Sequence, residues 1–344
     1  MELSPRKRAV LAAVAKAYIK TGEPVGSKTL AAMLKNAPSS ATLRSEMSEL
    51  CELGLLAQPH TSAGRVPTSR GLKTYVDSLM SPDKISEGDK AFIDRGLSNI
   101  HAAPEKIPEI GGELLHRLTG LPAIACFFTD EASKVRRVQL VPVSRSSVLL
   151  LLITADGRTR SRVFRPGREY DRGLDEKFSG IISRRIAGMP VGGLTKAYMQ
   201  SVTAEAGIDS LRLMPLMSAV FELAEDIKSS GVTLLGESAF YNICGSEDEA
   251  RRIISLINMR EPAAELLSGI KGGAGVIFGS ETGYKDLKSV TVTAAKFSGR
   301  GRYGGAVGVI GPDRISYERI IPVVEYTALR LSDLISEAQK DMEE

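Results

Sequence analysis

The chain of 344 residues is long enough for two or three domains, each with its own hydrophobic core. Hydrophobic residues make up 43% of it and charged residues 25%, which excludes collagen-like, coiled-coil and wholly disordered proteins. The apolar runs Ala9 to Ala15 and Val148 to Ile153 have seven and six residues, whereas a membrane helix needs about 20, so we expect no membrane span and no membrane partner.

The net charge of +4 is unevenly distributed along the chain. Residues 1–80 hold eleven lysines and arginines against six acidic residues, a balance of +5, so the remainder sums to −1. A small basic segment on a neutral body favours contact with a polyanion such as nucleic acid. An ordinary protein surface can carry the same charge, so charge alone does not identify the partner.

Cysteine and histidine give no pattern of metal ligands or disulfides. Cys51, Cys126 and Cys244 are far apart and odd in number, so we expect small buried residues in a reducing cytoplasm. We expect no metal and no other cofactor. Lys16 and Lys20 interrupt the apolar stretch near the N-terminus, which argues against a secretory signal and for a cytoplasmic protein.

The first predicted element is a helix that begins after Ser4. Ser4 can cap this helix, Pro5 suits its first position, and apolar residues recur at helical spacing from Val10 to Tyr18. Residues 21–24, which include Gly and Pro, then break the helix.

Two further helices follow after short turns. Ser27 can cap a second, short helix, and Ser39 or Ser40 can cap a third. The third helix is predicted to run to about Leu53, where Gly54 ends it.

A hairpin is predicted next, with residues 61–64 at its tip, and Thr68 opens a fourth helix. Three helices with a short turn between the second and third, followed by a hairpin, describe a winged helix-turn-helix, whose third helix enters the major groove of DNA. A helical bundle that joins proteins has the same helix spacing, so the pattern by itself leaves both readings open.

The candidate DNA-binding residues lie at the starts of the second and third helices, along the third helix and on the hairpin. They are Lys28, Ser39, Ser40, Thr42, Arg44, Ser45, Ser48, His60, Thr61 and Arg65. Small hydroxyl residues allow the helix to approach the DNA closely. Arg44 can pair two donors with guanine or bind a phosphate, and Arg65, predicted at the hairpin tip, can reach an adjacent groove or phosphate.

The rest of the chain reads as strands, then helices, then strands. The predicted strands cover 123–128, 135–143, 147–153, 159–164, 275–278, 289–295 and 306–310, and helices cover about 170–228, 248–267 and the C-terminal end. This order predicts one α+β sheet domain interrupted by an insertion. The glycine-rich stretches 272–275 and 301–311 lack the dinucleotide fingerprint, and no catalytic pattern is present.

Several blocks of sequence together resemble one family. The blocks are 18–30 (YIKTGEPVGSKTL), 40–47 (SATLRSEM), 52–56 (ELGLL), 58–68 (QPHTSAGRVPT), 304–312 (GGAVGVIGP) and 317–326 (YERIIPVVEY). They resemble the heat-inducible transcription repressor HrcA family. Ser45 stands where the family usually has Asn, Cys51 replaces a usual acidic residue, and Leu72 and Lys73 stand where aromatic or basic residues are common.

The resemblance implies an α+β fold with an N-terminal winged helix-turn-helix followed by a GAF-like mixed α/β domain with an inserted helical dimerisation domain. In this sequence we expect the DNA-binding domain over 1–80 and the first part of the GAF-like domain over 81–168. The inserted dimerisation domain is expected over 169–238 and the second part of the GAF-like domain over 239–344.

The resemblance also implies a negative regulator of class I heat-shock (chaperone) operons with no enzymatic activity. Its partners would be double-stranded DNA carrying the CIRCE inverted-repeat operator, a second copy of the chain, and a GroEL-type chaperonin whose titration, like heat, relieves repression. One helix-turn-helix reads only a few base pairs, so a homodimer on an inverted repeat is expected. The alternatives are a winged-helix regulator whose GAF-like domain binds a metabolite, and an enzyme or nucleotide-binding protein with an N-terminal interaction module.

Overall fold

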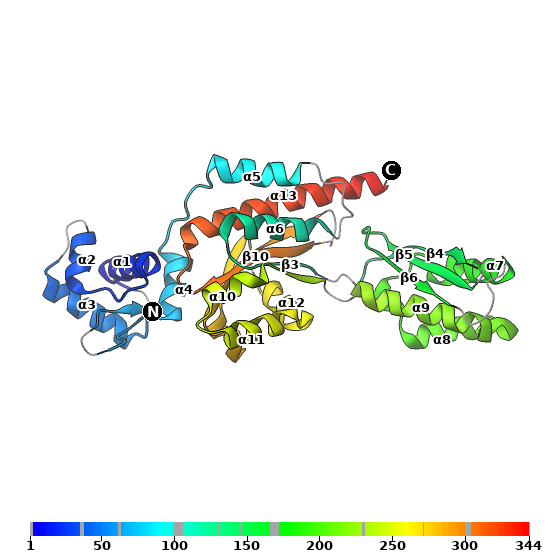
Figure 1. Ribbon diagram of the computed structural model, residues 1–344, viewed down its shortest axis with the longest axis horizontal. Helices are drawn as coiled ribbons and strands as arrows, with labels where there is room; N and C mark the ends of the chain where they lie inside the picture. Colours follow the sequence, from blue (N-terminus) through cyan, green and yellow to red (C-terminus); the bar gives the residue numbers. More distant parts are fainter. Residues whose placement is uncertain are drawn as a thin grey trace.

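The computed structural model describes residues 3–34, 38–60, 63–98, 106–128, 131–144, 146–165, 172–228, 231–270, 272–299 and 304–343. Helices and strands are mixed, and every pairing between the described strands is antiparallel, which confirms the predicted α+β class. Three parts follow one another along the long axis of the molecule (Figure 1), and we call them the N-terminal unit, the central unit and the distal lobe.

The N-terminal unit packs four helices and a short hairpin. Its elements are α1 (Pro5–Thr21), α2 (Ser27–Met33), α3 (Ser40–Glu52), β1 (Leu56–Ala57), β2 (Val66–Pro67) and α4 (Ser69–Ser78). As predicted, Ser4 caps α1, its Oγ accepting a hydrogen bond from a backbone N–H. The N-cap of α2 is Gly26, so Ser27 is the first helical residue and not the cap that we predicted. Buried leucines, Leu11, Leu30, Leu43 and Leu50 among them, form the core.

The central unit is a five-stranded sheet with helices on both faces. Its helices are α5 (Glu87–Leu97), α6 (Ile107–Thr119), α10 (Phe240–Ile243), α11 (Glu247–Asn258), α12 (Arg260–Ser268) and α13 (Tyr317–Glu343). Its strands are β3 (Ala123–Phe127), β7 (Val232–Leu235), β8 (Ala274–Phe278), β9 (Val290–Ser298) and β10 (Gly304–Pro312), in the order β7-β3-β10-β9-β8. The helices α6 and α13 cover one face and α11 and α12 the other.

Helices cover both faces of the central sheet, which explains the apolar character of its middle strands. A strand that is buried on both faces carries no alternating polar residues. Eight of the nine residues of β10 are buried. Gly308 lies where β10 meets β9, and a Cβ there would come 2.3 Å from the Cβ of Ala294. Gly308 therefore permits close packing of β10 against β9, a common reason for glycine inside a strand.

The distal lobe is a three-stranded sheet backed by helices, with its own core. It contains β4 (Val135–Ser144), β5 (Ser147–Thr154), β6 (Thr159–Phe164), α7 (Arg172–Ile181), α8 (Lys196–Ala204) and α9 (Ser210–Lys228). A π-helical turn, Ile182–Ile186, follows α7, and short 3-10 turns lie at Val191–Gly193 and Gly207–Asp209. The central unit has short 3-10 turns at Glu237–Ala239, Gly279–Glu281 and Lys285–Leu287. The core joins Val148, Leu150 and Leu152 of β5 to Leu216 and Val220 of α9.

The packing divides the chain differently from the sequence-based boundaries. We expected the insertion over 169–238, but the strands of 135–164 pack with α7–α9 in one core and pair with no described strand of the central sheet. Conversely, β7 belongs to the central sheet, where Val232 pairs with Cys126 of β3. The inserted part therefore covers about 134–228. It connects β3 to β7, which are neighbouring strands of the central sheet.

The described residues contain no helix long and apolar enough to span a membrane. They also bring together no group of three His, Cys, Asp or Glu side chains able to hold a metal ion. The three cysteines are free. Burial raises the pKa of the Cys126 thiol to about 12, so this cysteine is protonated and inert at neutral pH.

Candidate nucleic-acid interface

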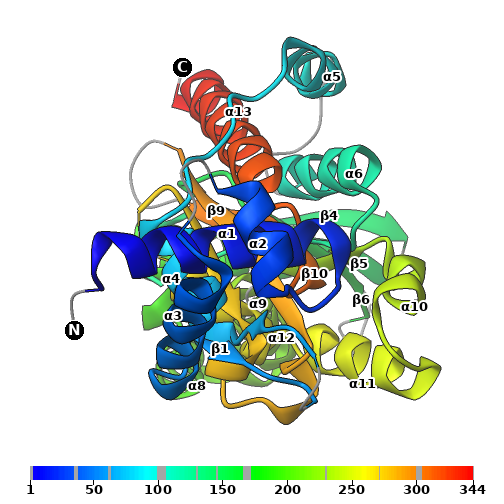
Figure 2. The same cartoon turned by 90° about the vertical axis from the view of Figure 1, so that its left-hand side faces the viewer.

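The third helix presents one apolar and one polar side. Leu43, Met47 and Leu50 of α3 are buried against the rest of the N-terminal unit, while Arg44 and Ser48 are exposed on the other side. Figure 2 looks onto this end of the molecule, with α1, α2 and α3 nearest the viewer. The helical period of 3.6 residues thus places the predicted contact residues on the solvent side of α3.

Hydroxyl groups hold the start of α3 and tie it to α2. Ser39 is the N-cap, and its Oγ accepts a hydrogen bond from the N–H of Thr42 at 3.2 Å and lies 2.9 Å from the Thr42 hydroxyl. Ser27 at the start of α2 and Ser40 at the start of α3 share a hydroxyl hydrogen bond of 2.9 Å. The two helix starts, and the exposed Lys28 beside Ser27, therefore lie together.

Two glutamates on α3 are matched by cations from α1. Lys7 Nζ lies 2.8 Å from a carboxylate oxygen of Glu49 and 3.9 Å from one of Glu46, and Arg6 lies 3.8 Å from Glu46. The hydrogen bond from Lys7 lowers the pKa of Glu49, and a hydrogen bond with Ser45 acts in the same direction. These pairs offset the negative charge that α3 would otherwise bring towards a phosphate backbone.

The pairing of Arg6 and Lys7 with α3 cannot be predicted from the local sequence. Their counterparts lie about 40 residues away, and no local pattern links the start of α1 to the middle of α3. The signal available was the basic cluster at residues 6–8 together with the acidic residues on the third predicted helix.

Arg65 is the last residue of the hairpin loop, directly after Gly64 of the predicted tip and before β2. Its backbone N–H and C=O pair with those of Val25 at 2.9 and 2.8 Å, which joins the α1–α2 turn to β2. Its side chain is half-buried, with Nη1 3.5 Å from the carbonyl oxygen of Ala63. A Cβ at Gly64 would lie 2.4 Å from the carbonyl carbon of Val25, so this approach requires glycine.

The remaining hairpin candidates are only partly placed. His60 is exposed beyond β1. Thr61 lies outside the described residues. The structure thus brings the candidates of α2 and α3 onto one end of the molecule, next to a hairpin that begins where α3 ends.

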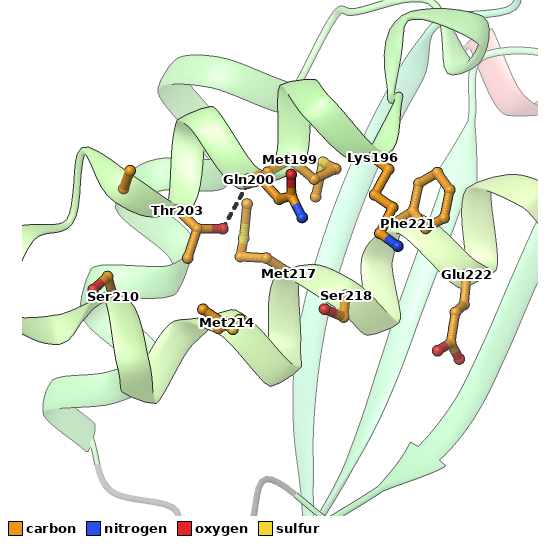
Figure 3. Close-up of a pocket in the computed structure, with 11 residues that line it drawn as sticks. Lys196, Met199, Gln200, Thr203, Ser210, Met214, Met217, Ser218, Phe221 and Glu222 are labelled. Atoms are coloured by element: carbon orange, nitrogen blue, oxygen red, sulfur yellow. Dashed lines mark hydrogen bonds between the residues drawn. The ribbon is translucent and has the colours of Figure 1, made fainter.

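Two grooves elsewhere in the molecule have mainly apolar linings. One, of about 440 Å³, lies between α8 and α9 of the distal lobe and is lined by Met199, Met217 and Phe221 among others (Figure 3). The other, of about 470 Å³, runs beside α13. Neither lies near the exposed side of α3.

Comparisons of the sequence with known proteins find the same family. The family model described as "HrcA protein C terminal domain" matches residues 109–321. A protein of Carboxydothermus hydrogenoformans named "Heat-inducible transcription repressor HrcA" is 30% identical to this chain, covering 97% of this chain and 98% of its own length. A protein of the same name from Sphingopyxis alaskensis is 33% identical, with 97% and 98% covered.

A solved structure described as "Crystal structure of a hypothetical protein at 2.2 A resolution" has a similar fold. It superimposes with a TM-score of 0.61 at 24% sequence identity, covering 98% of this chain and 99% of that one. The likeness extends over the N-terminal unit, the central unit and the distal lobe together.

Removing the cap of α3 should destabilise the N-terminal unit by a measurable amount. We expect Ser39→Ala to cost about 1 kcal/mol, because the N–H of Thr42 loses its acceptor. Ser48→Ala, on the exposed side of the same helix, should change stability by less than about 0.5 kcal/mol. Urea unfolding followed by circular dichroism compares the two variants, and equal effects would contradict the capping role.

Proposed function

The chain belongs to the HrcA family of heat-inducible transcription repressors, and on this premise we propose that its N-terminal unit is a winged helix-turn-helix that binds duplex DNA. The protein is a negative regulator of heat-shock genes. The observation that carries the DNA-binding role is the polar side of α3, where Arg44 and Ser48 face solvent opposite the buried Leu43 and Leu50. An α-helix exposed in this way fits the major groove.

The proposed contacts fall into two groups. Arg44, Ser45 and Ser48 on the exposed side of α3 are proposed to meet base edges, where an arginine can donate two hydrogen bonds to guanine. Lys28, the hydroxyls of 39–42 and the hairpin residues His60, Thr61 and Arg65 are proposed to bind the phosphate backbone and position the helix. The central unit, a sheet covered by helices, is proposed to be a GAF-like scaffold without a catalytic role.

We propose that two copies act together on the CIRCE inverted repeat, because one such unit reads too few base pairs for a specific site. The distal lobe is the proposed dimerisation domain. Strand β5 is apolar along both faces: Val148, Leu150 and Leu152 contact the helices, while Leu149 and Leu151 face the other way. Strands apolar on both faces are normally covered on both.

One face of the lobe sheet is covered by no described helix and carries exposed apolar residues, as protein interfaces do. The register places Val141 of β4, Leu149 of β5 and Val163 of β6 in one row on this face. Val141 and Val163 are 38% and 59% exposed. Two such faces can pack in a symmetric, self-complementary dimer, in which the same residues of both copies are buried.

Heat sensing is proposed to depend on modest stability of the native dimer. Heating lowers the population of the competent dimer, and a GroEL-type chaperonin restores it by refolding the repressor. Titration of the chaperonin by unfolded proteins then relieves repression.

The DNA-reading role of α3 can be tested with Arg44→Ala. If Arg44 contacts guanine, the loss of two hydrogen bonds should weaken operator binding by about 1–3 kcal/mol and reduce discrimination against scrambled DNA. Arg251→Ala, an exposed arginine on α11, is the matched control and should bind normally. Gel-shift titrations on both DNAs, with footprinting on the chaperone promoters of the source organism, measure the effect. Equal losses on operator and scrambled DNA would refute a base-reading role.

The dimer face can be tested with Val163→Asp. The substitution is on the surface of a single subunit, so folding should be kept, but a carboxylate buried between two sheets should weaken the dimer at least about tenfold. Ile208→Asp, at a residue 99% exposed on the helical side of the lobe, controls for the alternative face. Sedimentation equilibrium gives the masses. If Ile208→Asp dissociates the dimer and Val163→Asp does not, the dimer interface lies on the helical side of the lobe and not on the sheet.

The thermal mechanism predicts that operator binding by the purified repressor falls on heating through the heat-shock range and returns when chaperonin and ATP are supplied. Gel shifts at a series of temperatures, with and without chaperonin, measure the bound fraction. A repressor that holds its operator unchanged through heat shock without chaperonin would contradict the mechanism.

A further inference from the structure

The N-terminal unit meets the central unit at the start of α13, where one carboxylate contacts several parts of the chain. Oε1 of Glu318 accepts a hydrogen bond of 2.8 Å from the Tyr75 hydroxyl of α4 and lies 3.1 Å from Lys16 Nζ of α1. The backbone carbonyl of Glu318 accepts a hydrogen bond of 2.9 Å from the N–H of Asp83, in the segment between α4 and α5. Glu318 therefore binds both helices of the N-terminal unit that face the central unit, and the segment that leaves it.

An apolar contact surrounds this carboxylate. Leu72 and Tyr75 of α4 lie in the same buried cluster as Tyr317, Ile320 and Val324 of α13. The side of the N-terminal unit opposite α3 is thus part of the central hydrophobic core. A unit attached in this way has a fixed orientation, unlike one joined by a flexible linker.

Polar contacts extend the same surface on both sides. Lys73 of α4 lies 2.8 Å from Glu281. Asp313, just before α13, accepts a hydrogen bond of 2.6 Å from Thr291 of β9 and another from Ser69 at the start of α4. We call Lys16, Ser69, Lys73, Tyr75, Glu281, Asp313 and Glu318 the interdomain junction.

Within the interdomain junction, the hydrogen bond between Tyr75 and Glu318 joins a buried donor of the N-terminal unit to a carboxylate of the central unit. Tyr75 is 3% exposed, and burial raises the pKa of its hydroxyl, which stays a neutral donor and needs an acceptor. A buried hydroxyl without an acceptor is costly. By contrast, the side chain of Lys16 is 64% exposed, so water and salt screen its attraction to Glu318.

We propose that Glu318 is a positioning residue for DNA recognition: by holding Tyr75 and Lys16, it fixes the orientation of the N-terminal unit and hence the spacing at which a dimer presents its two α3 helices. The proposal rests on the proposed function as a dimeric DNA-binding repressor. The 27-residue α13, which begins at this junction, runs along the central sheet towards the side of the distal lobe (Figure 1). It therefore links the orientation of α3 to the rest of the subunit.

The consequence is a strict dependence of affinity on half-site separation. Two rigidly held binding units gain from acting together only when the separation of the half-sites matches that of the units. If the units are free to rotate, the gain at the matched separation falls and other separations are tolerated. Binding of one unit to one half-site does not depend on the junction.

The test uses full-length Glu318→Ala and Tyr75→Phe. Glu318→Ala removes the acceptor of the Tyr75 hydroxyl and the partner of Lys16, whereas Tyr75→Phe removes only the hydroxyl. Lys90→Gln, which breaks an exposed ion pair with Glu87 inside α5, is the matched control. Each protein is titrated on duplexes whose half-sites are separated by the operator distance or by one to five base pairs more or less, and on a single half-site.

We expect both junction variants to bind the operator about tenfold more weakly, because they lose part of the affinity gained when two linked units bind together. Their affinity should also depend less on the separation of the half-sites. Binding to the single half-site should stay within about twofold of the parent. An unchanged separation profile in both variants overturns the proposal, and so does an equal loss on every duplex including the single half-site.

A DNA-independent measurement separates this proposal from the proposed function. Hydrogen–deuterium exchange of the amides of residues 80–86 should rise several-fold in both variants, because movement of the loosened N-terminal unit opens the hydrogen bond from the N–H of Asp83 to the backbone carbonyl of residue 318. Unchanged exchange in both variants overturns the positioning role. If exchange rises while the parent protein binds no duplex, the junction holds the unit as proposed and the DNA-binding function is the part that fails.

Discussion

Burial of one apolar stripe on α3 is the constraint on which the proposed DNA recognition depends. Leu43, Met47 and Leu50 are each held inside the N-terminal unit, and burying a side chain of this kind contributes roughly 1.5–3 kcal/mol. The stripe fixes the rotation of the helix about its axis. Since successive residues differ by about 100° around a helix, a rotation by one position would turn Arg44 towards the core. The buried side chains thus determine which side chains of α3 are available for the proposed contact with DNA.

The same logic links the N-terminal unit to the remainder of the subunit. One side of the unit presents α3, and the opposite side contributes Leu72 and Tyr75 to the core shared with α13. Apolar contacts supply most of the attraction, and the polar contacts of the interdomain junction set the orientation. This division is general in proteins, because hydrophobic burial is non-directional whereas hydrogen bonds have a narrow range of geometry.

Local signals could be predicted from the sequence, and contacts between distant segments could not. Ser4, Gly54 and Thr68 mark helix ends through their own backbone and side-chain chemistry, and the structure has helix ends at all three. The strands in 135–164 were recognised as strands, but alternation does not reveal which sheet a strand joins. The position of Arg65 depends on pairing with the turn after α1, which hairpin rules do not include.

The insertion point of the distal lobe explains how such a large element can interrupt a sheet. The chain leaves after β3 and returns in β7, and these two strands pair with each other. In topological terms the lobe is the loop of one antiparallel hairpin. The entropy of closing a loop grows only with the logarithm of its length, so evolution can enlarge, shorten or replace this loop at little cost to the surrounding strands. The central sheet can therefore keep its β3–β7 pairing whatever the length of the lobe between these strands.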